Sequence, residues 1–226
     1  RATEVNLSQI CTELQAMINL ARDGGLAKEP KFDEVPELTR TIRDIAFSGD
    51  GEPTMIHNFA ECVEAVVDVK QAEGLETTKI VLITDAAGLD KADVKCGLEV
   101  MDRNNGEIWG KLDAGTEEYF KLVNRTNVKF ERILNNLLET SKVRPIIIQS
   151  LFFKVHGEAM SEAELEAYCS RLSNITEGGG QIREVHLYTV ARPTPETYAT
   201  KLESVELEQM AEEIREQTQL AVEVFP

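Results

Sequence analysis

The sequence is poor in basic residues and has no long apolar run. Its 24 lysine and arginine residues are outnumbered by 40 aspartate and glutamate residues, which gives a formal net charge of −16. Proteins bind nucleic acids largely through basic side chains that release counterions from the phosphates, so a nucleic acid is not an expected partner. Apolar runs far shorter than the roughly 20 residues that span a bilayer predict no membrane partner either.

Closely spaced cysteines are also missing. Cys11, Cys62, Cys96 and Cys169 stand far apart, so no metal-ligand or redox pair is visible. Cys62 and Cys169 fall on apolar helix faces, where a small buried thiol is expected. Nothing suggests disulfides, and Arg1–Glu4 does not open a signal peptide, so a cytoplasmic location is the default expectation.

Six short apolar segments alternate with amphipathic ones, which predicts an α/β protein. Strands are expected at 42–48, 80–83, 108–113, 146–152, 185–190 and 222–225. Repeated β-α units imply a parallel sheet, either open and doubly wound or closed into a complete or partial barrel. Residues 1–226 are expected to form one domain, with a C-terminal helix and short strand at about 204–226 as an extension.

Apolar residues at helical spacing predict helices between these strands and before the first one. The expected starts are Asn6 with Gln9, Asn58, Asp90, Asn127 and a Ser161–Glu164 capping box. A polar, proline-containing linker is expected from about Leu26 to Arg40. Because β-α repeats normally open on a strand and this one opens on a helix, a strand upstream of Arg1 is also expected.

The loop after the first predicted strand has the composition of a ligand site. It contains Ser48, Gly49, Asp50, Gly51, Glu52 and Pro53. The two glycines let a ligand approach the backbone closely, and Pro53 restricts Glu52 to an extended backbone. An ordinary strand-to-helix loop is the alternative interpretation.

Polar residues also follow the later strands, where ligands bind in either form of the sheet. They are Thr84 and Asp85, Lys111 and Asp113, Gln149 and Ser150, and Tyr188, Thr189 and Arg192. Together they indicate a polar small-molecule site. Among the histidines, His57 could line this site, His156 lies in a loop, and His186 within a strand is expected to pack in the core.

Four stretches resemble, in order and spacing, segments of the radical S-adenosylmethionine superfamily. They are Phe47-Ser48-Gly49-Asp50-Gly51-Glu52-Pro53-Thr54, Leu82-Ile83-Thr84-Asp85-Ala86, Lys111-Leu112-Asp113-Ala114 and Tyr188-Thr189-Val190-Ala191-Arg192-Pro193-Thr194. The first is similar to the family's Ser-Gly-x-Gly-Glu-Pro-Thr segment, and the last to a sixth-strand segment of iron-sulfur oxidoreductase-like members. The resemblance covers nearly the whole chain and implies a partial (β/α)6 TIM-like barrel.

The resemblance also implies a cofactor and site residues. S-adenosylmethionine would lie across the strand ends, with Glu52 and the backbone of its loop at the amino group. Lys111 and Asp113 would lie near the ribose and carboxylate, and Gln149, Ser150, Leu151 and Tyr188 near the adenine or ribose. A [4Fe–4S] cluster, reduced by an electron donor, would cleave the cofactor to a 5′-deoxyadenosyl radical that acts on an unknown substrate.

Two departures from the family pattern limit this prediction. The Cys-x3-Cys-x2-Cys motif that would hold the cluster is absent from this sequence, and Thr84-Asp85-Ala86-Ala87 lacks the usual Asn-Gly. Either the cluster loop and first strand lie upstream of Arg1, or this is a member without a cluster. Two other hypotheses stay open: a non-catalytic β/α ligand-binding or interaction domain, and a barrel enzyme that uses Glu52, Lys111 and Asp113 as acids and bases.

Overall fold

The chain forms two compact units, and each is considered by itself. A computed structural model describes residues 4–28, 30, 41–49, 51–192, 194 and 196–226. The first unit spans Arg1–Ile83 and Asp90–Glu107, and the second spans Thr84–Leu89 and Ile108–Pro226. Within the described ranges, no helix is long and apolar enough to cross a membrane.

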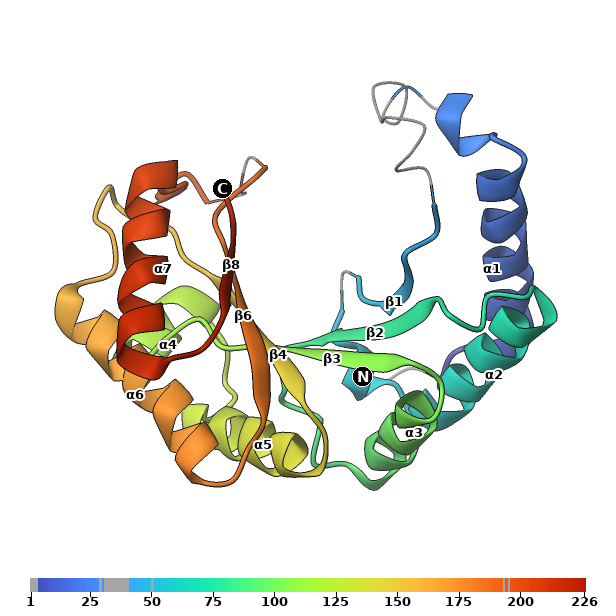
Figure 1. Cartoon of the computed structure of the whole chain (residues 1–226), viewed down its shortest axis with the longest axis horizontal. Helices are drawn as coiled ribbons and strands as arrows, with labels where there is room; N and C mark the ends of the chain where they lie inside the picture. Colours follow the sequence, from blue (N-terminus) through green and yellow to red (C-terminus); the bar gives the residue numbers. More distant parts are fainter. Residues whose placement is uncertain (1–3, 29, 31–40, 50, 193, 195) are drawn as a thin grey trace. The chain divides into compact units, whose positions relative to one another are not determined.

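The described part of the first unit consists of helices and two strands that pair in parallel (Figure 1). Its elements are α1 (Leu7–Arg22), η1 (Leu26–Lys28), β1 (Asp44–Phe47), η3 (Pro53–Met55), α2 (Phe59–Ala72), β2 (Lys79–Thr84) and α3 (Ala92–Asp102). Strands β1 and β2 pair in parallel, with Ile45 opposite Ile80. Helix α2 packs against both α1 and α3 and buries Phe59 and Cys62 completely.

A side chain of α3 caps the start of α2, and the N-cap residue of α2 bonds to the chain before α1. The Asp93 carboxylate accepts hydrogen bonds from the backbone N–H groups of Phe59 (2.7 Å) and Ala60 (3.3 Å). Asn58, the N-cap residue, makes no capping bond and instead exchanges two hydrogen bonds of 2.9 Å with the backbone of Val5. The expected helix start is therefore correct, while its cap comes from α3.

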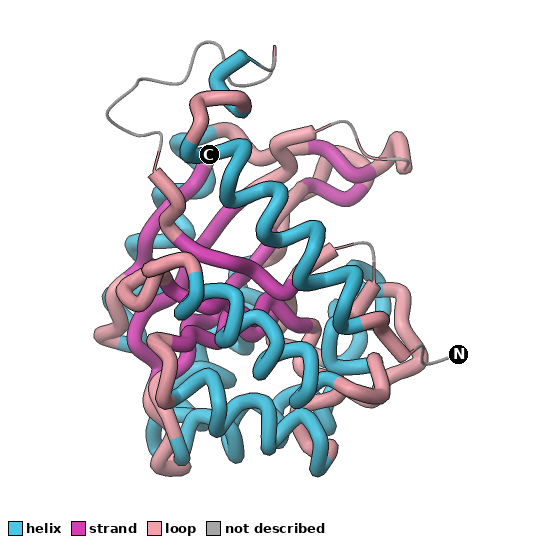
Figure 2. The backbone as a smooth tube through the Cα atoms, turned by 90° about the vertical axis from the view of Figure 1, so that its right-hand side faces the viewer, coloured by secondary structure: helices cyan, strands magenta, loops and turns pink. Residues whose placement is uncertain are grey.

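The second unit alternates strands and helices along the chain (Figures 1 and 2). Its elements are β3 (Gly106–Lys111), α4 (Glu117–Asn124), α5 (Phe130–Val143), β4 (Ile146–Leu151), β5 (Lys154–Val155), α6 (Glu162–Glu177), β6 (Ile182–Tyr188), β7 (Ala199–Thr200), α7 (Ser204–Thr218) and β8 (Val222–Phe225). Strands β3, β4, β6 and β8 are neighbours in that order and pair in parallel. The short strands β5 and β7 form a separate antiparallel pair.

The register of the second unit sorts side chains onto two faces, since paired residues of parallel strands point to the same side. One face carries small and apolar residues. Here an added Cβ at Gly110 would lie 2.4 Å from Leu137 of α5, and Ser150 bonds to Tyr168 of α6. Helices α5 and α6 therefore cover this face. The opposite face carries a row of polar side chains, formed by Lys111, Gln149, His186 and Glu223 in consecutive register.

The predicted α/β class is confirmed, and each of the six expected strands is present. Closure of the strands into a partial barrel stays a prediction, as does the single-domain organisation. The expected C-terminal helix and strand are α7 and β8, and β8 pairs in parallel with β6.

Several boundaries differ from those expected. The first strand begins at Asp44 rather than residue 42, and the fourth expected helix begins at Phe130, three residues beyond the expected Asn127. Helix α4 was not predicted from the sequence. Only one of its eight residues, Phe120, is buried, so it lacks the apolar stripe that indicates the other helices. Most of the predicted linker 26–40 lies outside the described residues, but its start, Leu26–Lys28, is a 3-10 turn.

Candidate functional site

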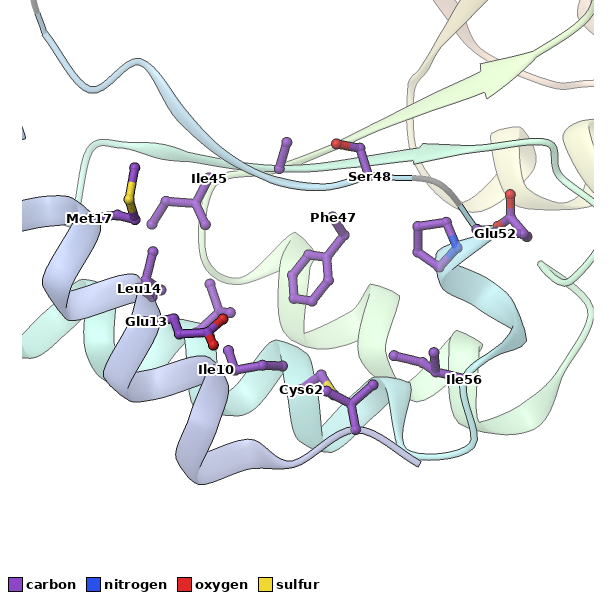
Figure 3. A pocket seen from close by; sticks show the side chains of 16 residues that line it. Ile10, Glu13, Leu14, Met17, Ile45, Phe47, Ser48, Glu52, Ile56 and Cys62 are labelled. Atoms are coloured by element: carbon purple, nitrogen blue, oxygen red, sulfur yellow. The ribbon is translucent and has the colours of Figure 1, made fainter. Parts of the chain in front are cut away.

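A groove of about 580 Å³ lies beside the end of β1 in the first unit (Figure 3). Its wall is mainly apolar and is formed by α1, α2 and β1, with Ile10, Leu14, Met17, Ile45 and Phe47 among the lining residues. Five predicted site residues line the same groove: Ser48, Gly49, Gly51, Glu52 and Pro53. The sixth residue of that loop, Asp50, lies outside the described part of the chain. The volume is within the range of ligand pockets, about 300–1,000 Å³.

The groove explains why α1 is less buried than its apolar pattern predicts. Of the expected inward face, only Ile18 is buried, while Met17 is 52% exposed. Figure 3 shows Ile45 and Phe47 of β1 pointing towards α1 and α2, with Glu52 at the opposite end of the view from Met17. The apolar face of α1 thus borders an open groove as well as the core.

Glu52 has a defined local role in its loop. Its Oε1 accepts hydrogen bonds from the backbone N–H of Thr54 (3.0 Å) and from the Thr54 hydroxyl (2.6 Å), so it caps the η3 turn. Its φ of −78° and ψ of 115° match the extended backbone expected before Pro53. These bonds hold the carboxylate in one orientation at the groove.

The glycines of this loop leave its backbone accessible. Gly49 has a φ of 150°, which L side chains rarely adopt. An added Cβ at Gly49 or Gly51 would meet no atom of the described residues within 4 Å.

A second carboxylate, Glu13 of α1, lines the groove and accepts a 2.8 Å hydrogen bond from Gln9. The predicted box of Asn6 and Gln9 is therefore only half formed, because Gln9 donates to Glu13 while Asn6 caps α1.

The second unit brings other predicted residues together at the ends of its strands. Lys111 and Gln149 are register neighbours in the polar row, and Tyr188 lies one step further along the same face. All three are partly exposed. Burial of the Tyr188 ring, with the nearby Asp113 charge, raises the pKa of the phenol above its usual range. Tyr188 therefore stays protonated at neutral pH.

Asp113 joins the ends of β3 and β4. It is 8% exposed, and its carboxylate accepts hydrogen bonds from the backbone N–H of Leu151 (2.8 Å) and from the Asn124 amide (3.0 Å). Burial raises the pKa of Asp113, although these bonds and the Lys111 charge oppose the shift. The buried Oδ1 of Asn124 finds no hydrogen-bond partner in the described part of the chain.

Two predicted ligand residues are occupied by internal hydrogen bonds. The Ser150 hydroxyl is fully buried, donates to the Leu112 carbonyl (2.6 Å) and lies 2.6 Å from the Tyr168 hydroxyl. The Thr84 hydroxyl, 1% exposed, accepts a bond of 3.0 Å from the Ala86 N–H. Ser150 and Thr84 therefore stabilise the strand ends, and Ser150 points to the face opposite Lys111 and Gln149.

The turn after β2 places a residue other than glycine in the left-handed region. Ala86 has a φ of 65°, in the left-handed region that favours glycine. The turn is held by the Asp85 carboxylate, which accepts from the Ala87 N–H (2.8 Å), and by the Asn136 amide, which donates to the Ala86 carbonyl (2.8 Å). Asp85 thus serves the turn itself.

Glu164 has a role that the sequence did not reveal. A capping box with Ser161 predicts that it bonds to the start of α6. Ser161 does cap the helix, but the buried Glu164 carboxylate accepts bonds from the N–H groups of Gly115 (2.6 Å) and Thr116 (3.0 Å) and from the Thr116 hydroxyl (2.6 Å). The predicted box is therefore half formed, because Glu164 holds the loop after β3 instead.

The cysteines of this chain do not fit a [4Fe–4S] cluster. All four are free thiols: Cys62 and Cys169 are buried, Cys11 is half-buried and Cys96 is exposed. Burial raises the pKa of Cys62 and of Cys169 to about 11, as for thiols that pack in the core. No two of the four cysteines are close in sequence, whereas a cluster loop needs closely spaced cysteines. Of the residues that the structure describes, the group with metal-ligand spacing contains no cysteine: Glu184, His186 and Glu223.

A scan against protein-family models finds no match for this chain, and a search of curated proteins finds none either.

Proposed function

We propose that this chain is an S-adenosylmethionine-binding α/β protein of the radical S-adenosylmethionine type. The observation that supports this proposal most is the groove beside β1, because five residues of the resembling loop line it. S-adenosylmethionine carries ammonium and sulfonium cations, a carboxylate, and an adenine ring whose faces can pack on apolar side chains. A groove with an apolar wall and the carboxylates of Glu13 and Glu52 has complementary chemistry.

In this proposal the groove of the first unit binds the methionine end of the cofactor. The Glu52 carboxylate and the backbone of Gly49 and Gly51 bind the methionine amino group. Asp113, Ser150 and Thr84 hold the strand ends through the hydrogen bonds described above.

We assign no reductive step to this chain. The [4Fe–4S] cluster and the electron donor belong to the family resemblance, and the cysteines present here do not fit such a cluster. The proposal is therefore limited to cofactor binding by these residues, and the substrate is left open.

Calorimetric titration of the full chain with S-adenosylmethionine tests the proposal. Glu52→Gln keeps an oxygen that can accept from Thr54 but removes the charge, so we expect affinity to fall by about tenfold or more, roughly 1.4 kcal/mol or above. Glu166→Ala, on the exposed side of α6, is the matched control and should bind like the wild type. Wild-type protein that binds no S-adenosylmethionine would overturn the proposal, and unchanged affinity in Glu52→Gln would remove Glu52 from the site.

A second candidate is an interaction domain that binds an extended apolar segment along β1. Among the described strands, β1 pairs only with β2, so its other edge is open beside the apolar groove. Unpaired strand edges accept added strands. Such a segment would protect the amides of Asp44–Phe47 from hydrogen exchange, whereas S-adenosylmethionine would not, and this separates the two candidates.

The third hypothesis, an enzyme that uses Glu52, Lys111 and Asp113 with Glu52 or Lys111 as the base, stays a prediction, and Asp113 adds no support to it. Its carboxylate is buried and already accepts two hydrogen bonds, one from backbone and one from Asn124. A general base must reach the proton that it removes.

A further inference from the structure

The polar face of the second unit carries a cluster of three potential metal ligands. Glu184 and His186 are two residues apart on β6, so they point to the same side, and Glu223 of β8 is the register partner of His186. The His186 Nε2 lies 3.1 Å from Glu184 Oε1 and 3.7 Å from Glu223 Oε2. One ligand atom from each residue lies within 4.8 Å of the others.

These separations are close to those between ligands of one metal ion. Zinc binds histidine nitrogen and carboxylate oxygen at about 2.0–2.2 Å, so ligand atoms at angles of about 90–110° are about 2.8–3.6 Å apart. The 3.1 Å separation lies within this range, and the 3.7 Å separation requires only a small movement of Glu223. The Glu223 side chain is 59% exposed and has room for this movement.

The imidazole of His186 is held in place from two sides. The ring of Trp109 packs edge-on against it at a centroid distance of 5.0 Å, and the ring of Phe225 at 5.3 Å. With a side chain only 9% exposed, His186 presents its Nε2 to the two carboxylates. A fixed ring lowers the entropy that is lost when a ligand binds.

We propose that Glu184, His186 and Glu223 form a binding site for a divalent transition-metal ion such as Zn²⁺ or Mn²⁺. One nitrogen and two carboxylate oxygens suit these ions, and two carboxylates neutralise a divalent charge. Three protein ligands leave at least one coordination position for water or a further ligand. The site lies in the same row as Gln149 and Lys111 and shares no residue with the groove beside β1.

Titration of the metal-free full chain with Zn²⁺ tests this site. A Cys96→Ser background removes the exposed thiol as a competing ligand. We expect one equivalent to bind saturably, and Glu223→Gln and His186→Ala each to weaken binding by about tenfold or more. Glu223 is exposed, so Glu223→Gln should fold normally even if replacement of the buried His186 does not.

Co²⁺ provides a second readout, because its visible absorption reports coordination geometry and thiolate ligands. His57→Ala is the matched control, since His57 is exposed and outside the cluster; it should bind Zn²⁺ like the parent protein. Absence of a saturable equivalent, or equal affinity in Glu223→Gln and the parent, would show that His186 and the two glutamates form only a hydrogen-bonded group. This result would not affect the S-adenosylmethionine proposal, which is tested by a different ligand.

Discussion

Single side chains decide whether a predicted polar residue faces a ligand or the protein interior. Lys111 and Gln149 stay on the partly exposed face of the second unit, whereas Ser150, next to Gln149 in sequence, points to the helices. In a strand, neighbouring residues alternate between faces, so Gln149 and Ser150 cannot both line one site. The sequence predicts that Gln149 and Ser150 lie on opposite faces of the strand. Which of the two faces the helices cover is shown only by the contacts of Leu137 with Gly110 and of Tyr168 with Ser150.

At the scale of one residue, we predict that Asp113 makes the stability of the fold depend on pH. Burial raises the pKa of its carboxyl above the usual 3.8, so the folded state binds the proton more tightly than the unfolded chain does. Its contribution is therefore fully present below pH 3.8 and is lost as the pH rises through the raised pKa.

Urea unfolding of the wild type and of Asp113→Asn between pH 3.5 and pH 8 measures this effect. Groups other than Asp113 titrate in both proteins and cancel in the difference. We expect the wild type to lose stability relative to Asp113→Asn as the pH rises from about 3.8. A difference that is constant with pH, or that changes in the opposite direction, would contradict the prediction.

At the scale of elements, the loop after β3 is held by α6 through tight backbone contact. A Cβ added at Gly115 would lie 2.1 Å from the Tyr168 nitrogen and 2.4 Å from the Ala167 carbonyl carbon. The Glu164 carboxylate accepts from the Gly115 N–H at the same place. Glycine is therefore required at position 115, because a Cβ there would clash with backbone atoms of α6, and no side-chain rotation can relieve that clash.

We predict that Gly115→Ala lowers the free energy of unfolding by about 3 kcal/mol or more, as overpacking in a rigid place does. Gly110→Ala is the matched comparison, since the close atom there is the mobile Leu137 Cδ2 at 2.4 Å. We expect it to cost about 1 kcal/mol. Urea unfolding measures both values, and equal losses in the two variants would show that backbone contact is not the deciding factor.

At the scale of the whole molecule, the acidic composition sets solution behaviour. The net charge of −16 at pH 7 keeps copies of the chain apart by repulsion. The isoelectric point is near 4.7, where this repulsion disappears. The same excess of carboxylates suits the cationic ligands proposed for the groove and for the His186 cluster.

We therefore predict a solubility minimum near pH 4.7. The concentration of polyethylene glycol that precipitates the protein should be lowest there and should rise by pH 7.5, because the net charge grows with pH. Circular dichroism at each pH separates precipitation of folded protein from acid unfolding. A precipitation threshold that does not change with pH would mean that net charge does not control association.

The sequence by itself determined the α/β class, the six strands and most helices, because apolar periodicity and capping residues are local signals. It also indicated the loop of Ser48–Pro53, five of whose residues line one groove. Only the tertiary structure decided which polar residues form hydrogen bonds inside the protein and which face outward. Glu164 bonds to Gly115, about fifty positions earlier, and His186 meets Glu223 through strand pairing. Such contacts depend on the pairing of distant elements, and no local pattern in the chain encodes them.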